Sequence, residues 1–226
     1  LLGITKMDAG ELYINPDDAI DIIPDISNIY DEPFADSSQL PTTLISKLTK
    51  QYVKVSLSGD GGDELFGGYN RYLKAPKLWK LLRLTPYFIK NNSTSILNKI
   101  SNTNYNKIEK VLNLFLSNNK KINFLSTKIN RLSYRLNNVN SRNALYLSLI
   151  TEWQNFNEVV INSKEPYHFM SEKNNLDFLD NFEQEMMYND TLSYLPDDIL
   201  TKVDRASMSV GLESRSPFLD HKIVEL

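Results

Sequence analysis

The segment from Tyr52 to Ser58 limits the fold more than any other part of the sequence. Its residues, Tyr-Val-Lys-Val-Ser-Leu-Ser, are rich in β-branched side chains and alternate in polarity, which predicts a β-strand. The strand leads directly into a loop that contains three glycines. A chain with this feature is expected to place the loop at the end of a sheet.

The residues before this strand predict a strand–helix–strand unit. Residues 11–14 favour a short strand, and Asn15 to Asp18 combine a cap, a first-turn proline and first-turn acids, which start a short helix that Pro24 ends. After an acidic loop, a second helix is expected from about Ser38. Its apolar positions share one face that should pack on a sheet: Leu40, Leu44, Ile45 and Leu48. This order predicts a right-handed βαβ unit in a parallel sheet.

Composition excludes several classes of protein. No cysteine is present, which removes disulfides, thiolate metal sites and a cysteine nucleophile. The net charge of −3, from 25 Lys and Arg against 28 Asp and Glu, argues against a protein that mainly neutralises nucleic-acid phosphates. No stretch approaches the roughly 20 apolar residues needed to span a bilayer, so we expect no membrane association and a cytoplasmic location.

The middle of the chain differs in charge from the rest. Residues 91–150 carry nine Lys and Arg and one acid, Glu109, a charge of +8 that leaves −11 for the remainder. Apolar residues at helical spacing favour amphipathic helices here, and residues 143–161 and 176–195 also favour helices. A solvated helical insertion is the favoured interpretation, and a basic surface for a polyanion is the alternative.

The loop from Ser58 to Tyr69 is the best candidate for a ligand site. Ligands of open parallel sheets bind at the carboxyl ends of strands. The glycines Gly59, Gly61 and Gly62 let backbone N–H groups converge on a phosphate. Neither a Walker A loop nor a dinucleotide fingerprint matches, because the required Lys-Ser/Thr pair and the third small residue are missing.

Three carboxylates stand in this loop where phosphate is expected: Asp60, Asp63 and Glu64. Bare acids would repel a phosphate, so Mg²⁺ between them is the favoured explanation, because Mg²⁺ takes one or two carboxylates together with phosphate oxygens. The alternative is that Asp63 and Glu64 only complement the start of the next helix. That alternative leaves Asp60 unexplained.

A second candidate stretch runs from Leu195 to Gly211. As a helix with Asp197 near its cap and Gly211 at its end, it has a buried stripe made by Ile199, Val203, Ala206 and Val210. Lys202, Arg205 and Ser209 then lie together on a flank, and an Asp198–Lys202 pair on a plain amphipathic helix is the alternative. Residues 213–221 favour a strand-like tail. The two histidines, His168 and His221, are expected to be structural, and Trp79 and Trp153 to belong to the core.

Three of these stretches occur in the order found in one family. They are the acidic loop Asp31–Ser38, the loop Ser58–Tyr69, and the tail from Lys202 to His221. Together they resemble the synthetase domain of glutamine-hydrolysing asparagine synthetases. The resemblance implies an α/β fold, a doubly wound parallel sheet of the adenine-nucleotide alpha-hydrolase-like type, present in part, with a large mostly helical lobe. Residues 1–75 would be the α/β nucleotide-facing part, 76–185 the helical lobe, and 186–226 a substrate-facing helix and tail.

The resemblance also implies a reaction and site residues. ATP would activate the side-chain carboxylate of aspartate as β-aspartyl-AMP, and ammonia derived from glutamine would then form asparagine. Ser58 and Gly59 would contact the nucleotide through the backbone, Gly61 and Gly62 would also bind it, and Asp63 with Glu64 would hold Mg²⁺. Asp60 stands where the family commonly has Glu, one methylene longer, and would handle adenylate and ammonia chemistry. Arg205 and Lys202 would face substrate or phosphate.

The ends of the sequence suggest a piece of a longer protein. The family's Ser-Gly-Gly-x-Asp-Ser nucleotide loop, its amino-terminal glutaminase and a downstream lysine do not occur in these residues, so we expect this piece to be inactive alone. A homodimer is compatible with this interpretation. Two alternatives stay open: a related synthetase that activates another carboxylate, as β-lactam synthetases do, and a non-catalytic anion-binding module.

Overall fold

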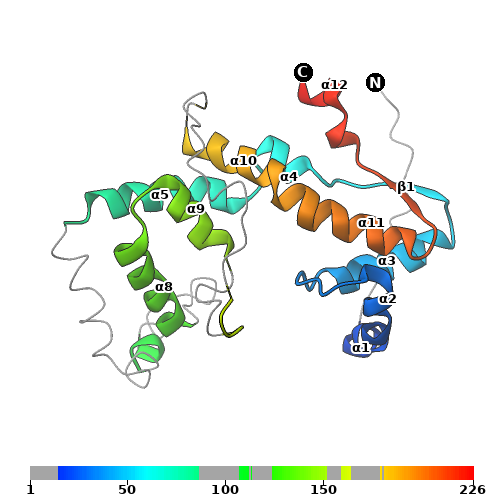
Figure 1. Cartoon of the computed structure of the whole chain (residues 1–226), viewed down its shortest axis with the longest axis horizontal. Coiled ribbons are helices and arrows are strands. Elements are labelled where there is room, and N and C mark those ends of the chain that lie inside the picture. The colour runs from blue at the N-terminus through cyan, green and yellow to red at the C-terminus, as the bar shows by residue number, and fades with distance from the viewer. Residues whose placement is uncertain are drawn as a thin grey trace. The chain divides into compact units, whose positions relative to one another are not determined.

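The computed structural model describes residues 15–86, 107–111, 113, 124–151, 159–163, 179 and 181–226. The chain divides into two compact units, one of Leu1–Gly68 with Met187–Leu226 (unit 1) and one of Tyr69–Met186 (unit 2). Figure 1 shows the elements of both. The expected strand at residues 11–14 lies outside the described residues, as do His168 and Trp153, and the three functional parts assigned to the chain stay a prediction.

Unit 1 begins with two short helices. Helix α1 (Pro16–Ile22) starts where the sequence predicts, and the Asn15 backbone N–H donates to Asp18 Oδ2 over 2.8 Å. It ends before Pro24, as expected. The chain then continues through a 3₁₀ turn (Ile23–Asp25) into α2 (Ile26–Tyr30), so Pro24 separates two helices instead of leading straight into a loop.

Helix α3 (Gln39–Lys50) packs against α11 (Thr201–Met208) with a polar side. Its buried residues are Gln39, Thr43 and Ser46, whereas Ile45 of the predicted apolar face is 51% exposed. The expected packing face is therefore wrong. The Thr43 and Ser46 hydroxyls donate to carbonyls four residues earlier, both over 2.8 Å. Because these polar groups are satisfied within their own helix, small side chains can line the contact at little cost.

The sheet in the described residues has two parallel strands, β1 (Val55–Leu57) and β2 (Glu213–Arg215), with Leu57 opposite Arg215. The strand predicted within residues 52–58 is confirmed over Val55–Leu57. The strand-like tail predicted over residues 213–221 is a strand only at Glu213–Arg215, because the residues after it form a 3₁₀ turn and a helix. The predicted pairing of residues 11–14 with this strand stays a prediction, since residues 11–14 lie outside the described residues. A doubly wound sheet is not confirmed by these two strands. Ser56 and Ser214 are half-buried on one face, and Leu57 on the other is 74% exposed.

The helix that contains Lys202 starts earlier than the sequence suggests. Helix α10 (Phe182–Leu192) is followed by a π-helical segment (Leu195–Leu200), which continues into α11. Asp197 therefore lies inside helical structure, and its expected position at a cap is wrong. The wide turns free carbonyl groups, and the Thr201 hydroxyl donates to one of them, that of Pro196, over 2.9 Å.

The end of this helix is predicted correctly. Gly211 has a φ of 69°, which a residue without a Cβ adopts freely. Its N–H donates to the Met208 carbonyl, and the Leu212 N–H to that of Ser207, each over 2.9 Å. After β2, a 3₁₀ turn (Pro217–Leu219) and α12 (His221–Val224) follow.

Unit 2 is mostly helical in its described residues, as expected for the lobe. Its longer helices include α5 (Asn70–Leu84), α8 (Leu125–Asn138) and α9 (Arg142–Ile150). Tyr72, Leu145 and Tyr146 are fully buried in its core, and Trp79 is half-buried. Helix α9 ends at Ile150 with Thr151 extended, which is shorter than the predicted helix over 143–161.

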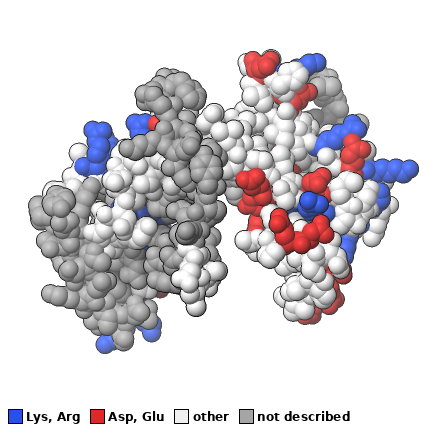
Figure 2. Space-filling model, in the orientation of Figure 1, with Lys and Arg blue, Asp and Glu red and all other residues white. Residues whose placement is uncertain are grey.

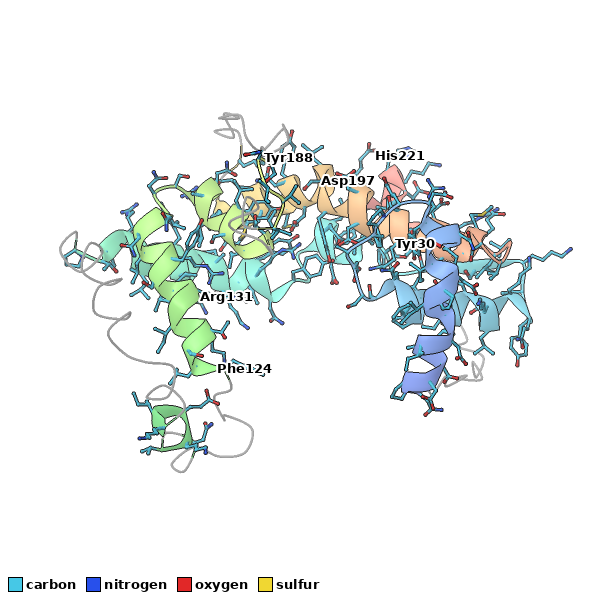
Figure 3. The ribbon with its side chains drawn as sticks, turned by 60° about the horizontal axis from the view of Figure 1, so that its bottom comes forward. Tyr30, Phe124, Arg131, Tyr188, Asp197 and His221 are labelled. Atoms are coloured by element: carbon cyan, nitrogen blue, oxygen red, sulfur yellow. The ribbon has the colours of Figure 1, made fainter. Side chains whose placement is uncertain are left out.

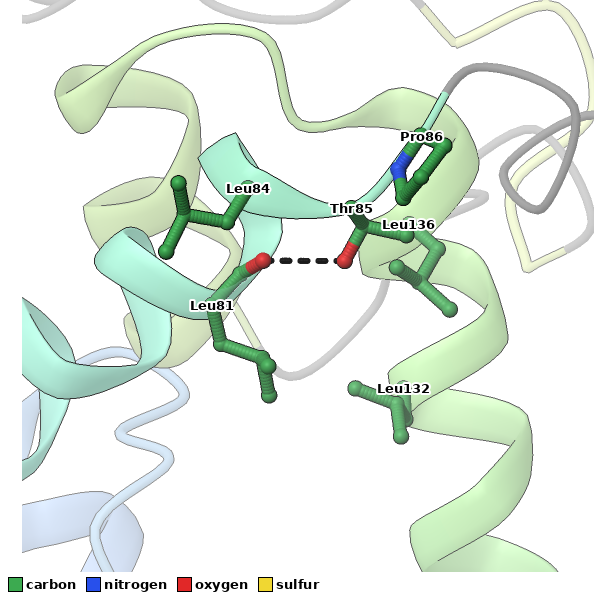
Figure 4. A pocket seen from close by; sticks show the side chains of 6 residues that line it. All are labelled: Leu81, Leu84, Thr85, Pro86, Leu132 and Leu136. Carbon is green, nitrogen blue, oxygen red and sulfur yellow. Dashed lines mark hydrogen bonds between the residues drawn. The ribbon is translucent and has the colours of Figure 1, made fainter.

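An apolar groove of about 370 Å³ lies between the end of α5 and α8. In Figure 4 its lining residues surround the hydrogen bond from the Thr85 hydroxyl to the Leu81 carbonyl, 2.8 Å long. In the described part of the chain, no helix combines the length and the apolar character that crossing a bilayer requires.

Candidate active site

The two strands deliver two serines to the same edge of the sheet. Ser58 follows β1 and Ser216 follows β2, and their hydroxyl oxygens are 3.0 Å apart. The Ser58 N–H donates to the Arg215 carbonyl over 2.8 Å and so extends the ladder by one bond. This N–H is thus already used within the protein. Of the Ser58 groups, the hydroxyl is the donor that can turn toward a ligand.

The glycines of the loop differ in what they face. A Cβ at Gly61, where φ is 84°, would overlap the Leu219 side chain, and one at Gly62 would lie 3.1 Å from the Phe218 ring. A Cβ at Gly59 would meet nothing within 4 Å. Gly61 and Gly62 therefore make room for the turn after β2, and Gly59 borders open space.

The three carboxylates of the loop have different surroundings. Asp60 is half-buried in the turn, Asp63 is exposed, and Glu64 is only 1% exposed within α4 (Gly62–Phe66). Among the residues that the structure describes, no three His, Asp or Glu side chains gather in a way that could hold a metal ion. The donor chemistry of Asp63 fits Mg²⁺ when phosphate oxygens complete the shell. The burial of Glu64 does not fit that role.

The two glycines that follow α4 determine the space around Asp63. Gly67 ends α4 with a φ of 74°, and the Gly68 N–H donates to the Asp63 carbonyl over 3.0 Å. A Cβ at Gly68 would overlap the Asp63 carboxylate. The glycine pair that interrupts the helix therefore leaves space for the side chain that we expect to bind the metal.

Lys202 lies in the interior of unit 1. Its ammonium nitrogen is 2.6 Å from Asp36 Oδ2, and the two side chains are only 10% and 21% exposed. The prediction that Lys202 lies on one flank with Arg205 and Ser209 is therefore wrong, because Lys202 is buried whereas those two residues are exposed. The ion pair of Lys202 is with Asp36 and not with Asp198, the partner that the alternative named. Lys202 instead joins α11 to the loop before α3.

The Asp36 carboxylate is held by several donors. Ser38 contributes its N–H over 2.8 Å and its hydroxyl over 2.6 Å. Burial alone would raise the pKa of Asp36, but the hydrogen bonds from Lys202 and Ser38 outweigh burial and hold the pKa below its usual range. Asp36 is thus an anion that fixes the acidic loop against α11.

Tyr30 strengthens the same junction. Its hydroxyl donates to the Lys202 carbonyl over 3.2 Å, and its ring stacks on Phe34 with centroids 5.0 Å apart. Figure 3 shows Tyr30 at the end of its helix, beside the helix that carries Asp197. The acidic loop is therefore held at both ends.

Asp198 is the second acid near Lys202. Its Oδ1 is buried and has no hydrogen-bond partner in the described part of the chain. Burial raises the pKa of Asp198, and the negative charge of Asp36 raises it further, against the opposing charge of Lys202. This carboxyl therefore holds its proton to a higher pH than an exposed aspartate does.

Arg205 lies on the solvent-facing flank of α11, away from Lys202. Its guanidinium is 3.8 Å from Asp31 Oδ2, with side chains 51% and 76% exposed, so this long contact contributes little to stability. Figure 2 shows acidic side chains gathered on the face of unit 1 that it presents. His221, 74% exposed beside Asp220, lies on the surface and not in the core.

Sequence reasoning missed Ser216, Phe218, Leu219 and Asp36 as parts of the site. Asp36 and Lys202 are 166 residues apart, and no local pattern pairs them. One signal was present: Lys202 stands three residues after Ile199 and four before Ala206, on the buried face. A lysine on an apolar stripe indicates a buried acidic partner.

Comparisons with known proteins point to one family. The sequence model of the asparagine synthase family matches residues 4–226. The chain is 27% identical over 218 residues to asparagine synthetase [glutamine-hydrolyzing] 1 of Bacillus subtilis. The aligned region covers 94% of this chain and 30% of that protein. A candidate asparagine synthetase of Methanocaldococcus jannaschii is 42% identical over 78 residues, 34% of this chain and 15% of that protein.

The chain spans about 30% of the length of the Bacillus subtilis protein. No solved structure gives a significant match. The family match covers nearly all of the sequence and contains each stretch from which the site is built, and the family domain is of the α/β type. The chain therefore belongs to the asparagine synthase family.

Proposed function

We propose that the protein forms asparagine from aspartate and ammonia at the expense of ATP, and that the loop from Ser58 to Gly68 handles the nucleotide. The observation that carries this proposal is the position of the loop at the carboxyl end of β1, beside the end of the parallel strand β2. Ligands of parallel α/β sheets lie at such edges. The complete protein is proposed to contain the doubly wound sheet to which β1 and β2 belong.

The proposed reaction has two steps. The aspartate side-chain carboxylate attacks the α-phosphorus of ATP, diphosphate leaves, and β-aspartyl-AMP forms. Ammonia then attacks the acyl carbon, and AMP leaves with the bond electrons. The ammonia is proposed to come from glutamine on a further domain. The name of the Bacillus subtilis relative describes that protein as glutamine-hydrolysing.

Each residue of the site that is not fully buried has a proposed task. Ser58 and Gly59 orient the phosphates, and Asp63 would hold Mg²⁺, which neutralises the charge on the leaving diphosphate. Arg205 offers a cation to the substrate carboxylate or phosphate. Asp60, half-buried in the turn, is the proposed acceptor for the ammonia proton.

Lys202, Glu64, Gly61 and Gly62 are proposed to position the site without touching the substrate. Lys202 is occupied by Asp36, Glu64 is buried, and the two glycines accommodate Leu219 and Phe218. Their role is to hold the acidic loop and the nucleotide loop in place, since reaction rates depend steeply on orientation.

A substrate panel tests the proposal. The protein in its natural length is assayed for exchange of labelled diphosphate into ATP with Mg²⁺ and one acid at a time. Exchange that requires aspartate supports asparagine synthesis. Exchange with another carboxylic acid and none with aspartate would favour a related synthetase, and no exchange with any acid would refute both.

The anion-binding alternative finds less support. Arg135 donates to the Ser148 hydroxyl and carbonyl, both over 3.2 Å, and Arg142 pairs with Glu185 at 2.5 Å. These cations of the basic segment are engaged within unit 2. Nucleic-acid binding that weakens steeply with salt would revive this alternative.

A further inference from the structure

The serine pair at the sheet edge has a property that the family resemblance does not assign. Ser58 Oγ and Ser216 Oγ are 3.0 Å apart, and either oxygen can be the donor. Each hydroxyl carries one proton and accepts through two lone pairs. One proton is used between the two oxygens. Whichever serine donates, the other hydroxyl keeps a proton that can be given to a third group.

The surroundings of the pair direct that proton toward the ligand edge. The Ser58 N–H is bound to the Arg215 carbonyl, so this N–H is not left for an anion. Both serines are only half-buried, and the next residue, Gly59, borders open space. Alternation along the strands places Ser56 and Ser214 on the same face, one pair further from the edge.

We propose that Ser58 and Ser216 act as one unit that donates a single O–H to an anionic oxygen of a nucleoside triphosphate, and that Ser216 is therefore a binding residue. This inference rests on the proposed function, because it takes the loop as the nucleotide site. The donated O–H takes the place of the backbone contact with the nucleotide that was expected at Ser58. The segment after β2 thus contributes a polar group as well as Phe218 and Leu219.

The unit has a signature that distinguishes it from two independent hydroxyls. After either removal, the remaining hydroxyl loses the partner that orients it toward the ligand, so the second removal adds little. A hydrogen bond to a charged group typically contributes enough for about a 10-fold change in affinity. The variants Ser58→Ala and Ser216→Ala should each weaken MgATP binding by about this factor. The double variant should bind MgATP no more than about 2-fold more weakly than the single variant with the lower affinity.

Titration calorimetry of the natural-length protein with MgATP tests this. Ser214→Ala is the matched control, since it removes a hydroxyl from the same face two residues earlier, and it should bind as the unchanged protein does. Ser216→Thr keeps a hydroxyl and should retain most of the affinity. Thermal unfolding of every variant separates lost binding from lost stability.

The outcomes distinguish the inference from the proposed function. Unchanged affinity in Ser216→Ala, with or without a lower melting temperature, or independent additive losses in the double variant, would overturn the inference alone. The expected coupled losses without aspartate-dependent exchange would leave the inference standing and remove the proposed function. An unchanged protein that does not bind MgATP would overturn both.

Discussion

At the scale of single residues, Lys202 ties two distant stretches of the chain together. Its contact with Asp36 is 2.6 Å long and mostly shielded from solvent, whereas the contact between Lys47 and Asp25 is 3.6 Å long and exposed. Charge pairs of these two kinds differ in their contribution to stability, because only the buried one leaves an uncompensated charge when it is broken.

The first prediction compares the two pairs. Lys202→Met should lower the free energy of unfolding by about 2 kcal/mol, because Asp36 loses its counter-ion while part-buried. Lys47→Met should cost less than about 1 kcal/mol. Chemical denaturation measures both, and the double variant Lys202→Met/Asp36→Asn should recover part of the loss. Equal effects of the two lysine variants would contradict the account.

The second prediction concerns pH and Asp198. The pKa of Asp198 is raised in the folded protein. Its protonated form therefore stabilises the folded protein at pH values below the pKa in the unfolded chain, about 3.9. This stabilisation is lost as pH rises through the pKa in the folded protein. Asn imitates the protonated acid. Asp198→Asn should therefore match the unchanged protein at low pH and become the more stable one as pH rises.

Thermal unfolding from acidic to neutral pH measures this difference. Asp36 acts with the opposite sign: its pKa is lowered, so its contribution is present above the unfolded pKa and is lost as pH falls through the folded one. Both proteins should thus lose stability together in acid. A difference between them that shrinks as pH rises would contradict the assignment to Asp198.

At the scale of elements, the short helix α4 derives its function from how it ends. Gly67 turns the chain with a positive φ, and Gly68 lies against the Asp63 side chain. A longer helix would have been cheaper by about 1 kcal/mol per glycine replaced. The interruption is thus explained by the space that Asp63 requires.

The third prediction places a methyl group in that space. Gly68→Ala should displace the Asp63 carboxylate and raise the Mg²⁺ concentration needed for half-maximal diphosphate exchange by about 10-fold, the effect typical of disturbed ligand positioning. Gly211→Ala is the comparison, since it strains a residue with a φ of 69° far along the chain. It should lower the melting temperature and leave the Mg²⁺ requirement unchanged. The opposite pattern would refute the argument.

At the scale of the whole molecule, local signals in the sequence predicted local structure well. The start of α1 at Asn15, the strand β1 and the end after α11 at Gly211 all depend on neighbouring residues and are confirmed. The prediction of which side of α3 packs was wrong. A stripe of Leu and Ile dominates the hydrophobic pattern of the sequence, whereas Thr43 and Ser46 are the residues buried in the contact. Tertiary packing, not periodicity, decides which side of such a helix is covered.

The candidate site was predictable only along the chain. Ser58, Gly59, Asp60 and Asp63 stand within six consecutive residues, and their glycine and acid pattern identifies them. Ser216 and Asp36 reach the site from other elements. Their partners are more than 150 residues away, so they become visible only when the strands pair and α11 meets the acidic loop.

Asp63 is proposed to serve nucleotide chemistry at the edge of the sheet. Its most direct test is aspartate-dependent exchange of diphosphate into ATP by the natural-length protein with Asp63→Asn, beside Asp25→Asn as an exposed acid outside the loop. Asp63→Asn should lose exchange activity by about 100-fold or more, and Asp25→Asn should keep full activity. Full exchange activity in Asp63→Asn would contradict this role.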